Sequence, residues 1–160
     1  METAIKRDPR GQGDQGEMSA ILWLASQGLP VFLPVGHSPH YDLITDLGDG
    51  LVRVQVKTST QNLKDRWDVS VCNRGGNRSW NGLVKRLDAS HYDRLFVLVG
   101  DGRRWFIPAA EVGGGSHIRL GGPKYAEFEI ERGQPLQKAR PSLDSATPWR
   151  DSRAVKGDGL

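Results

Sequence analysis

Four residues with metal-binding or proton-transferring side chains stand where a hairpin and a helix can bring them together. The alternation of valines and polar residues over 51–59 predicts a strand with Gln55 and Lys57 on one face and the valines on the other. Asp42 belongs to the run that precedes this strand, and Glu17 belongs to a predicted helix. We therefore expect two carboxylates, an amide and a lysine around one cavity.

Such a set of side chains suits the hydrolysis of phosphodiesters. Carboxylate and amide oxygens hold Mg²⁺, with Mn²⁺ as an alternative. The cation neutralises charge in the transition state and makes its bound water more acidic. A nearby lysine orients that water or stabilises the developing charge.

Each of these residues also has an ordinary structural interpretation. Glu17 stands three residues after Asp14, which is the spacing of a capping box at the start of a helix. Asp42 can be a turn residue, Gln55 a solvated strand residue and Lys57 a surface lysine. The four residues together favour the cavity more than any one of them does.

The order of these residues resembles the pattern of the PD-(D/E)XK nuclease superfamily. That pattern is a helical Glu, a Pro–Asp region, and an acidic residue two positions before a Lys. Here a Gln replaces the last acidic residue, and this Gln-x-Lys variant resembles the branch of group I intron homing endonucleases. The likeness covers about residues 12–131. The segments that carry it are Gly16-Glu17, Pro39-His40-Tyr41-Asp42, Gln55-Val56-Lys57, Tyr92-Asp93-Arg94-Leu95-Phe96-Val97, Phe106-Ile107-Pro108 and Ile118-Arg119-Leu120 with Tyr125 and Phe128.

The resemblance implies a role for each of the four residues in a DNA endonuclease. Asp42 would be the principal metal ligand, Gln55 would supply an amide oxygen, and Lys57 would act on the nucleophilic water. Glu17 would be a further ligand, directly or through water. The Gln removes one negative charge, so metal affinity should fall or depend more on Glu17 and the DNA phosphate. In the Gln-x-Lys branch this is compatible with activity, whereas in another branch it could mark an inactive enzyme.

A basic stretch without acidic residues spans positions 73–87. Basic and aromatic side chains on a glycine-rich loop suit contact with phosphates and packing on bases or sugars. The alternative is a solvated loop with Trp80 packed on the core. The residues that we assign to DNA contact are Arg74, Arg78, Trp80, Lys85 and Arg86.

The order of the helices and strands expected around these residues predicts an α+β, or mixed α/β, fold. We expect the first helix at 15–27, with Asp14 as its N-cap and Gly28 at its end. The resemblance implies a restriction-endonuclease-like core, with this helix before a mixed sheet and a further short helix. Strands are expected at 31–35, 41–47, 51–59, 67–72, 94–99, 103–107 and 118–120, turns at 48–50 and 100–102, a loop at 73–83, a short helix at 87–92 and one helical turn at 108–111.

The whole chain has 160 residues, of which 37 % are hydrophobic and 26 % charged, and this suits one soluble domain. The single cysteine, Cys72, excludes an internal disulfide and a Cys-rich zinc site. With no signal peptide, a reducing cytoplasm is expected. No apolar run is long enough to span a membrane. The spacings of a histidine zinc site, a serine hydrolase triad and a Walker loop are missing.

The net charge is +3, and two of these three charges fall in residues 134–160. We expect a flexible arm over 1–13, a PD-(D/E)XK-like domain over 14–133 and a disordered tail over 134–160. The expected function is a Mg²⁺-dependent DNA endonuclease. The alternatives are an inactive DNA-binding module of the same fold and an unrelated α+β protein that mediates protein contacts. Because cutting both strands of a duplex generally needs two active sites, a homodimer or larger homo-oligomer is expected.

Overall fold

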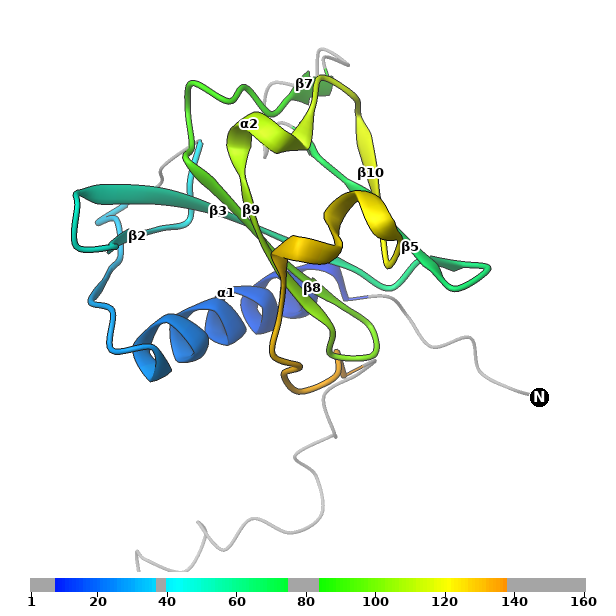
Figure 1. Cartoon of the computed structure of the whole chain (residues 1–160), viewed down its shortest axis with the longest axis horizontal. Helices are drawn as coiled ribbons and strands as arrows, with labels where there is room; N and C mark the ends of the chain where they lie inside the picture. Colours follow the sequence, from blue (N-terminus) through cyan, green and yellow to red (C-terminus); the bar gives the residue numbers. More distant parts are fainter. Residues whose placement is uncertain (1–7, 37–39, 75–83, 138–160) are drawn as a thin grey trace, which may run out of the picture.

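A computed structural model of the chain describes residues 8–36, 40–74 and 84–137, and for 73–74 and 84–86 it describes the backbone alone. Its main feature is a mixed six-stranded sheet in which only β3 and β8 are parallel neighbours (Figure 1). In spatial order its strands are β1 (Val31–Phe32), β2 (Leu43–Asp46), β3 (Leu51–Ser59), β8 (Arg94–Val99), β9 (Arg104–Pro108) and β11 (Glu129–Ile130). The α+β prediction is therefore confirmed, and the predicted bounds of β3 and β8 are those observed.

The first helix, α1 (Pro9–Ser26), begins six residues before the predicted start. Asp8 is its N-cap and accepts a hydrogen bond from the Gly11 backbone N–H at 3.0 Å, while Pro9 occupies the first turn. The prediction of Asp14 as N-cap was wrong, because the Asp8-Pro9 pair supplies an earlier start signal. The helix ends as predicted before Gly28, whose φ of +74° suits glycine.

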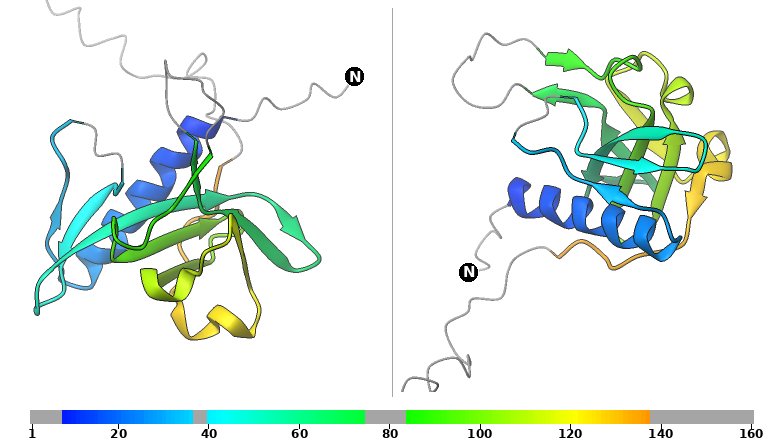
Figure 2. Two further views of the ribbon diagram at one scale, coloured as in Figure 1. Left: turned by 90° about the horizontal axis from the view of Figure 1, so that it is seen from above. Right: turned by 90° about the vertical axis from the view of Figure 1, so that its left-hand side faces the viewer.

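The helix α1 covers one face of the sheet (Figure 2), and a hydrophobic core lies on each face. The helix-side core lies between α1 and the sheet, and the distal core lies under α2 (Ala109–Val112) and the 3₁₀ helix η1 (Pro123–Phe128). Strand β8 contributes to both, with Phe96 and Leu98 on the helix side and Leu95, Val97 and Val99 on the distal side. This alternation makes β8 the central strand of the domain.

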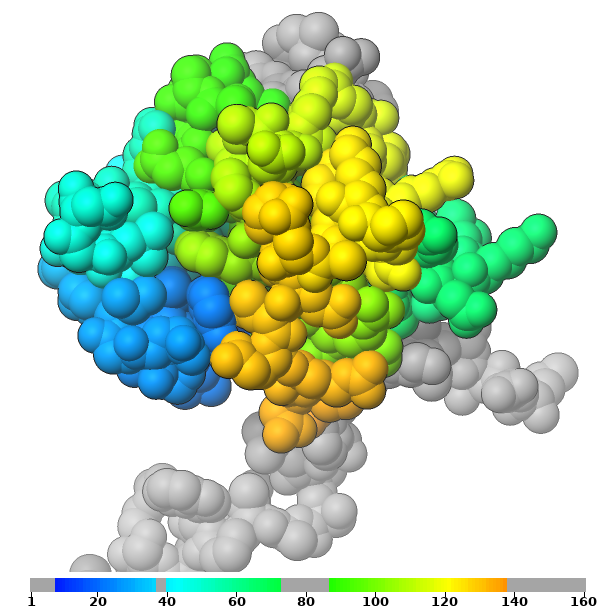
Figure 3. All heavy atoms as spheres, in the orientation of Figure 1, coloured from blue at the N-terminus to red at the C-terminus, as the bar shows by residue number. Residues whose placement is uncertain are grey.

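A second, three-stranded antiparallel sheet covers part of the distal core. It consists of β10 (His117–Leu120), β5 (Arg66–Ser70) and β4 (Asn62–Leu63). Lys64 and Asp65 form the two-residue turn from β4 to β5, both with positive φ, as in a type I′ turn. The hairpin projects from the molecular surface at the right of Figure 3. A third sheet pairs β6 (Cys72–Arg74) with β7 (Val84–Arg86).

Two of the predicted elements were wrong. Residues 87–92 form a turn instead of a helix, because the Asp88 side chain accepts a hydrogen bond from the Ser90 N–H at 2.8 Å, and such local bonds compete with helix formation. Residues 73 and 74, predicted as loop, belong to β6. The predicted hairpin of β2 and β3 is confirmed, with positive φ at Gly48 and Gly50.

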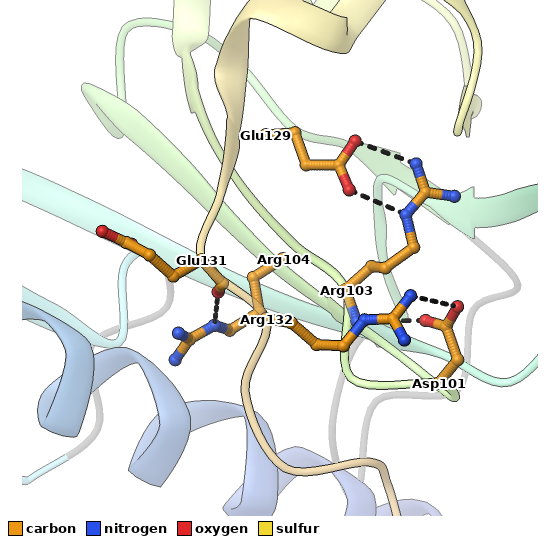
Figure 4. Close-up of polar contacts among 6 residues, drawn as sticks. All are labelled: Asp101, Arg103, Arg104, Glu129, Glu131 and Arg132. Atoms are coloured by element: carbon orange, nitrogen blue, oxygen red, sulfur yellow. Dashed lines mark hydrogen bonds and ion pairs between the residues drawn. The ribbon is translucent and has the colours of Figure 1, made fainter.

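The segment after β11 packs back on the domain (Figure 4). Arg104 Nε donates to the Glu131 carbonyl at 2.6 Å, and the Trp23 indole donates to the Glu131 carboxylate at 2.7 Å. Leu136 is buried in the helix-side core. Of the residues assigned to the tail by their composition, Leu136 therefore packs in the core beneath α1, and the Gln137 N–H donates to Gln15 Oε1 of α1 at 2.8 Å. Residues 138–160 lie outside the described residues.

Ion pairs surround this segment. The guanidinium of Arg103 makes two hydrogen bonds with the Glu129 carboxylate, at 2.7 and 2.8 Å, and Arg132 pairs with Asp101 at 3.5 Å (Figure 4). Among the described residues, no helix is long and apolar enough to cross a membrane.

Candidate active site

The site forms at an edge of β3 that no strand covers in the described part of the chain. Strand β2 pairs with β3 only as far as Val54, whereas β8 continues alongside β3 to Ser59. A cavity of about 640 Å³ lies at this uncovered edge, between the first turns of α1 and strand β5. Its lining includes all four residues predicted from the sequence, Glu17, Asp42, Gln55 and Lys57.

Asp42 directly precedes β2 and extends the hydrogen bonding between β2 and β3 by one residue. Its backbone N–H donates to the Val54 carbonyl at 2.9 Å. Its Oδ2 accepts from the Val56 N–H at 2.6 Å and from Gln55 Nε2 at 2.5 Å. The carboxylate thus takes the place of a strand carbonyl and is held at the edge of the sheet.

Gln55 is almost fully buried, with 6 % of its surface exposed. Its Nε2 donates to Asp42 Oδ2 and, at 3.3 Å, to the Val56 carbonyl. Because the Val56 carbonyl can only accept, this bond assigns the donating end of the amide as nitrogen. No described residue donates to its Oε1, so this oxygen remains available to a ligand in the cavity.

The two carboxylates of the cavity are costly to ionise. Burial raises the pKa of Asp42, and the Val56 N–H and the charge of Lys57 only partly oppose this. Burial also raises the pKa of Glu17, and the negative charges of Asp42 and Asp14 add to the effect. A bound cation would offset both the burial and the repulsion.

Lys57 faces the cavity from the same strand as Gln55. Burial lowers the pKa of its ammonium group, against the opposing charge of Asp42. Its Nζ donates to the Cys72 carbonyl at 3.4 Å, which directs the side chain toward the start of β6. A lysine of lowered pKa gives up its proton more readily than a surface lysine.

Glu17 reaches the cavity because α1 crosses close to β3. A Cβ atom on Gly16 would lie 2.5 Å from Thr58 Cγ2 and 3.1 Å from Val56 Cγ1, so only glycine permits this approach. Glu17 lies in the middle of α1, and the capping-box interpretation is therefore wrong. Glu17 thus comes from the helix side of β3, whereas Gln55 and Lys57 come from the other face of the strand. They meet at the uncovered edge of β3.

The donor set fits a hard divalent cation. Within the described ranges, no group of three or more His, Cys, Asp or Glu side chains is arranged to hold a metal. The set here is two carboxylates of raised pKa and an amide oxygen without a donor. Oxygen ligands of this kind, completed by water and phosphate oxygens, are those that Mg²⁺ takes.

The residues predicted to contact DNA are not placed by the structure. Arg78 and Trp80 lie outside the described residues, and of Arg74, Lys85 and Arg86 only the backbone in β6 and β7 is described.

Sequence reasoning missed three residues of the second sheet that line the cavity, namely Asp68, Ser70 and His117. The alternation of β5 could have indicated Asp68 and Ser70, because Trp67 and Val69 face the core between them. His117 had no local signal, since it reaches the cavity through pairing with Ser70.

Comparison with known proteins identifies the family. The sequence description of the PD-(D/E)XK endonuclease domain matches residues 7–131. The structure is similar to that of the bacterial homing endonuclease I-Ssp6803I, with a TM-score of 0.54, 25 % sequence identity and 84 % of each chain covered.

A more distant similarity, with a TM-score of 0.47 and 11 % identity, is to Hjc, a Holliday junction resolvase from the archaeal hyperthermophile Archaeoglobus fulgidus. It covers 75 % of this chain and 91 % of that one. Curated protein sequences gave no match. The matched residues 7–131 include the four predicted site residues of the cavity. Because this match covers most of the sequence, the chain belongs to the PD-(D/E)XK endonuclease family.

Proposed function

We propose that this protein is a Mg²⁺-dependent DNA endonuclease that hydrolyses phosphodiester bonds. The observation that carries the proposal is the meeting of Glu17, Asp42, Gln55 and Lys57 in one cavity of a PD-(D/E)XK endonuclease domain. The similarity to a homing endonuclease of known structure supports DNA as the substrate.

Asp42, the Oε1 of Gln55 and Glu17 are the groups that would hold the cation. When bound, a divalent cation neutralises charge on a phosphate and makes a water molecule more acidic. The hydrogen bonds that Asp42 Oδ2 accepts from Gln55 and from the Val56 N–H fix the carboxylate in the lining of the cavity. This preorganisation lowers the cost of assembling the site around a phosphate.

Lys57 would act on the attacking water. The lowered pKa of its ammonium group makes exchange of a proton with that water easier at neutral pH. In its protonated form the same group stabilises the negative charge that develops on the phosphate oxygens. Both roles require Nζ to face the cavity, whose lining includes this residue.

Hydrolysis of both strands of a duplex would need two copies of this site, so we propose a homodimer or larger homo-oligomer. A plasmid assay separates the two products, because a single cut gives nicked circles and two opposed cuts give linear DNA. If dimerisation limits the second cut, the linear fraction should rise with protein concentration.

The decisive experiment is cleavage of supercoiled plasmid with MgCl₂, MnCl₂ or EDTA. Cleavage should need the metal, and Asp42→Ala and Lys57→Ala should each abolish it. Asp49→Ala and Lys124→Ala are matched controls, because both positions are exposed and lie outside the cavity lining. Cleavage that persists in EDTA, or in both cavity variants, would contradict the proposal.

The alternative function is a DNA-binding module that has lost its catalysis, and the Gln at position 55 is the observation that favours it. In that case the wild type binds duplex DNA with a steep salt dependence and never cuts it. A Gln55→Glu variant that gains cleavage would identify the Gln as the cause. Absence of DNA binding at low salt would contradict both functions.

A further inference from the structure

The proposed function assigns no role to the outer face of the second sheet. Because side chains alternate along a strand, Trp67 and Val69 of β5 and Ile118 and Leu120 of β10 enter the distal core. The residues between them point the other way. We call them the second-sheet face, which consists of Arg66, Asp68, Ser70, His117 and Arg119.

This face is continuous with the cavity. Asp68, Ser70 and His117 line it together with the four site residues, and His117 stands directly opposite Ser70 in the strand pairing. Arg119 lies opposite Asp68, one step farther from the cavity, and Arg66 lies beyond Asp68 on β5. The face therefore leads outward from the candidate active site along two paired strands.

The second sheet is fixed to the end of β3. The Ser59 hydroxyl donates to the Asp68 carbonyl at 2.5 Å, and the Asp68 N–H donates to the Gln61 carbonyl at 3.0 Å. A ligand bound to this face would consequently keep a constant position relative to Lys57, which lies two residues before Ser59.

The two arginines of the face are not paired with acidic side chains, in contrast to three other arginines of the described structure. Arg53, Arg103 and Arg132 each pair with a carboxylate. Arg66 and Arg119 are exposed, and neither forms an ion pair with a described residue.

The acidic residues near this face form no ion pair with either arginine. Asp68 Oδ2 lies 3.9 Å from His117 Nε2, and Asp65, in the adjoining turn, forms no ion pair with a basic group of the described residues.

Arg66 also packs against the backbone near the end of β10. Its guanidinium lies against Gly122, just after β10, where a Cβ atom would overlap it. An arginine placed in this way loses less conformational freedom on binding than a free surface side chain. Its planar group has the donor geometry that suits phosphate oxygens.

We infer that the second-sheet face binds the sugar–phosphate backbone of the DNA that flanks the bond to be cut, with Arg66 and Arg119 each contacting a phosphate. This inference rests on the proposed DNA substrate. It assigns DNA contact to a surface separate from the basic stretch at 73–87.

The test measures how binding of a labelled duplex depends on NaCl, in a Lys57→Ala background that prevents cleavage. Each lost phosphate contact should lower the slope of log K against log salt by about 0.9 for duplex DNA. Arg66→Gln/Arg119→Gln should therefore lower the slope by about 1.8. Arg66→Lys/Arg119→Lys, which keeps both charges, should retain most of it.

The matched control is Lys124→Gln/Arg132→Gln, which removes two exposed charges outside the second-sheet face and outside the cavity lining. Its slope should stay that of the background. An unchanged slope for Arg66→Gln/Arg119→Gln, or an equal loss in the control, overturns the inference while the proposed function stands. No DNA binding by the background protein at low salt overturns both.

The thermal midpoint of each variant reports on its folding. If Arg66→Gln disturbs the contact with Gly122 and lowers that midpoint, Arg119→Gln alone provides the same test. Arg119 is exposed, and its single substitution should lower the slope by about 0.9. An unchanged slope for a folded Arg119→Gln variant would likewise overturn its assignment as a phosphate contact.

Discussion

Asp42 combines two opposing effects at one carboxylate. Hydrogen bonds from Gln55 and Val56 fix its position, yet burial still raises its pKa. In the absence of metal, the folded chain therefore holds this carboxyl group in surroundings that disfavour its ionised form. The cost of this arrangement is measurable as a dependence of stability on pH.

Replacement of Asp42 by Asn should reveal that dependence. A carboxyl group whose pKa is raised by folding contributes stability at low pH and loses that contribution as the pH rises through the raised pKa. In EDTA, the free energy of unfolding of the wild type should therefore fall relative to that of Asp42→Asn as the pH rises above about 4, the ordinary pKa of an Asp side chain. Urea unfolding at several pH values measures it.

Magnesium supplies the control for this experiment. MgCl₂ should stabilise the wild type at neutral pH more than it stabilises Asp42→Asn, because the variant lacks the charged ligand. A difference between the two proteins that stays constant with pH would show that ionisation of Asp42 does not cost stability.

At the scale of single residues, the sequence predicted which four side chains would line one cavity, but not the contacts that position them. The alternation of β3 placed Gln55 and Lys57 on one face, and the hairpin placed Asp42 beside them. The wrong capping role of Glu17 arose because two start signals lie six residues apart, and a local pattern does not decide between them. The contact of Gly16 with Thr58, which positions Glu17, joins distant segments and left no local pattern.

At the scale of elements, the approach of α1 to β3 can be changed at a single atom. Gly16→Ala should destabilise the fold by about 1–3 kcal/mol, because its Cβ would overlap Thr58 Cγ2 and force α1 away from β3. Glu17 would move with the helix, so plasmid cleavage should fall as well. Thermal unfolding and the cleavage assay measure the two effects.

Gly13→Ala is the matched substitution in the same helix. A Cβ on Gly13 meets no atom within 4 Å, so the variant should gain about 0.5–1 kcal/mol from helix propensity. Equal changes in stability for Gly13→Ala and Gly16→Ala would mean that close packing of α1 on β3 is not required.

A second contact between elements holds the segment that carries Asp42. The rings of His40 and His91 stack with centroids 4.0 Å apart, which joins the residues before β2 to the turn before β8. His91→Ala should lower kcat roughly tenfold, since displacement of a catalytic group by about 1 Å can cost up to a hundredfold. Stability should change by no more than about 1 kcal/mol, the worth of one aromatic pair.

His91→Phe separates stacking from other roles of the imidazole. The phenyl ring can stack on His40, so this variant should keep most of the activity that His91→Ala loses. Loss of activity in both variants, with no change in hydrogen exchange at residues 40–42, would contradict a positioning role for the stack.

Across the whole molecule, the sequence predicted those strands whose apolar residues follow a strong and continuous pattern. The bounds of β3 and β8 were predicted because each has a continuous pattern of apolar residues, and β8 then became the strand shared by the two cores. The two-residue turn at Lys64 was missed because neither of its residues is glycine or asparagine. Composition also misassigned residues 134–137, since one leucine among polar residues gives no periodic signal.

Leu136 tests this last correction. It is 7 % exposed in the helix-side core, although a disordered tail beginning at residue 134 would leave it in solvent. Its truncation to Ala should cost about 2–5 kcal/mol, through lost burial and the cavity left beneath α1. Leu22→Ala, at a position 64 % exposed on that helix, should change stability by less than about 0.5 kcal/mol. If urea unfolding gives the two variants equal midpoints, the segment after β11 adds nothing to the domain. A large loss of stability for Leu136→Ala alone would show that this segment stabilises the packing of α1, and of Glu17 with it, against the sheet.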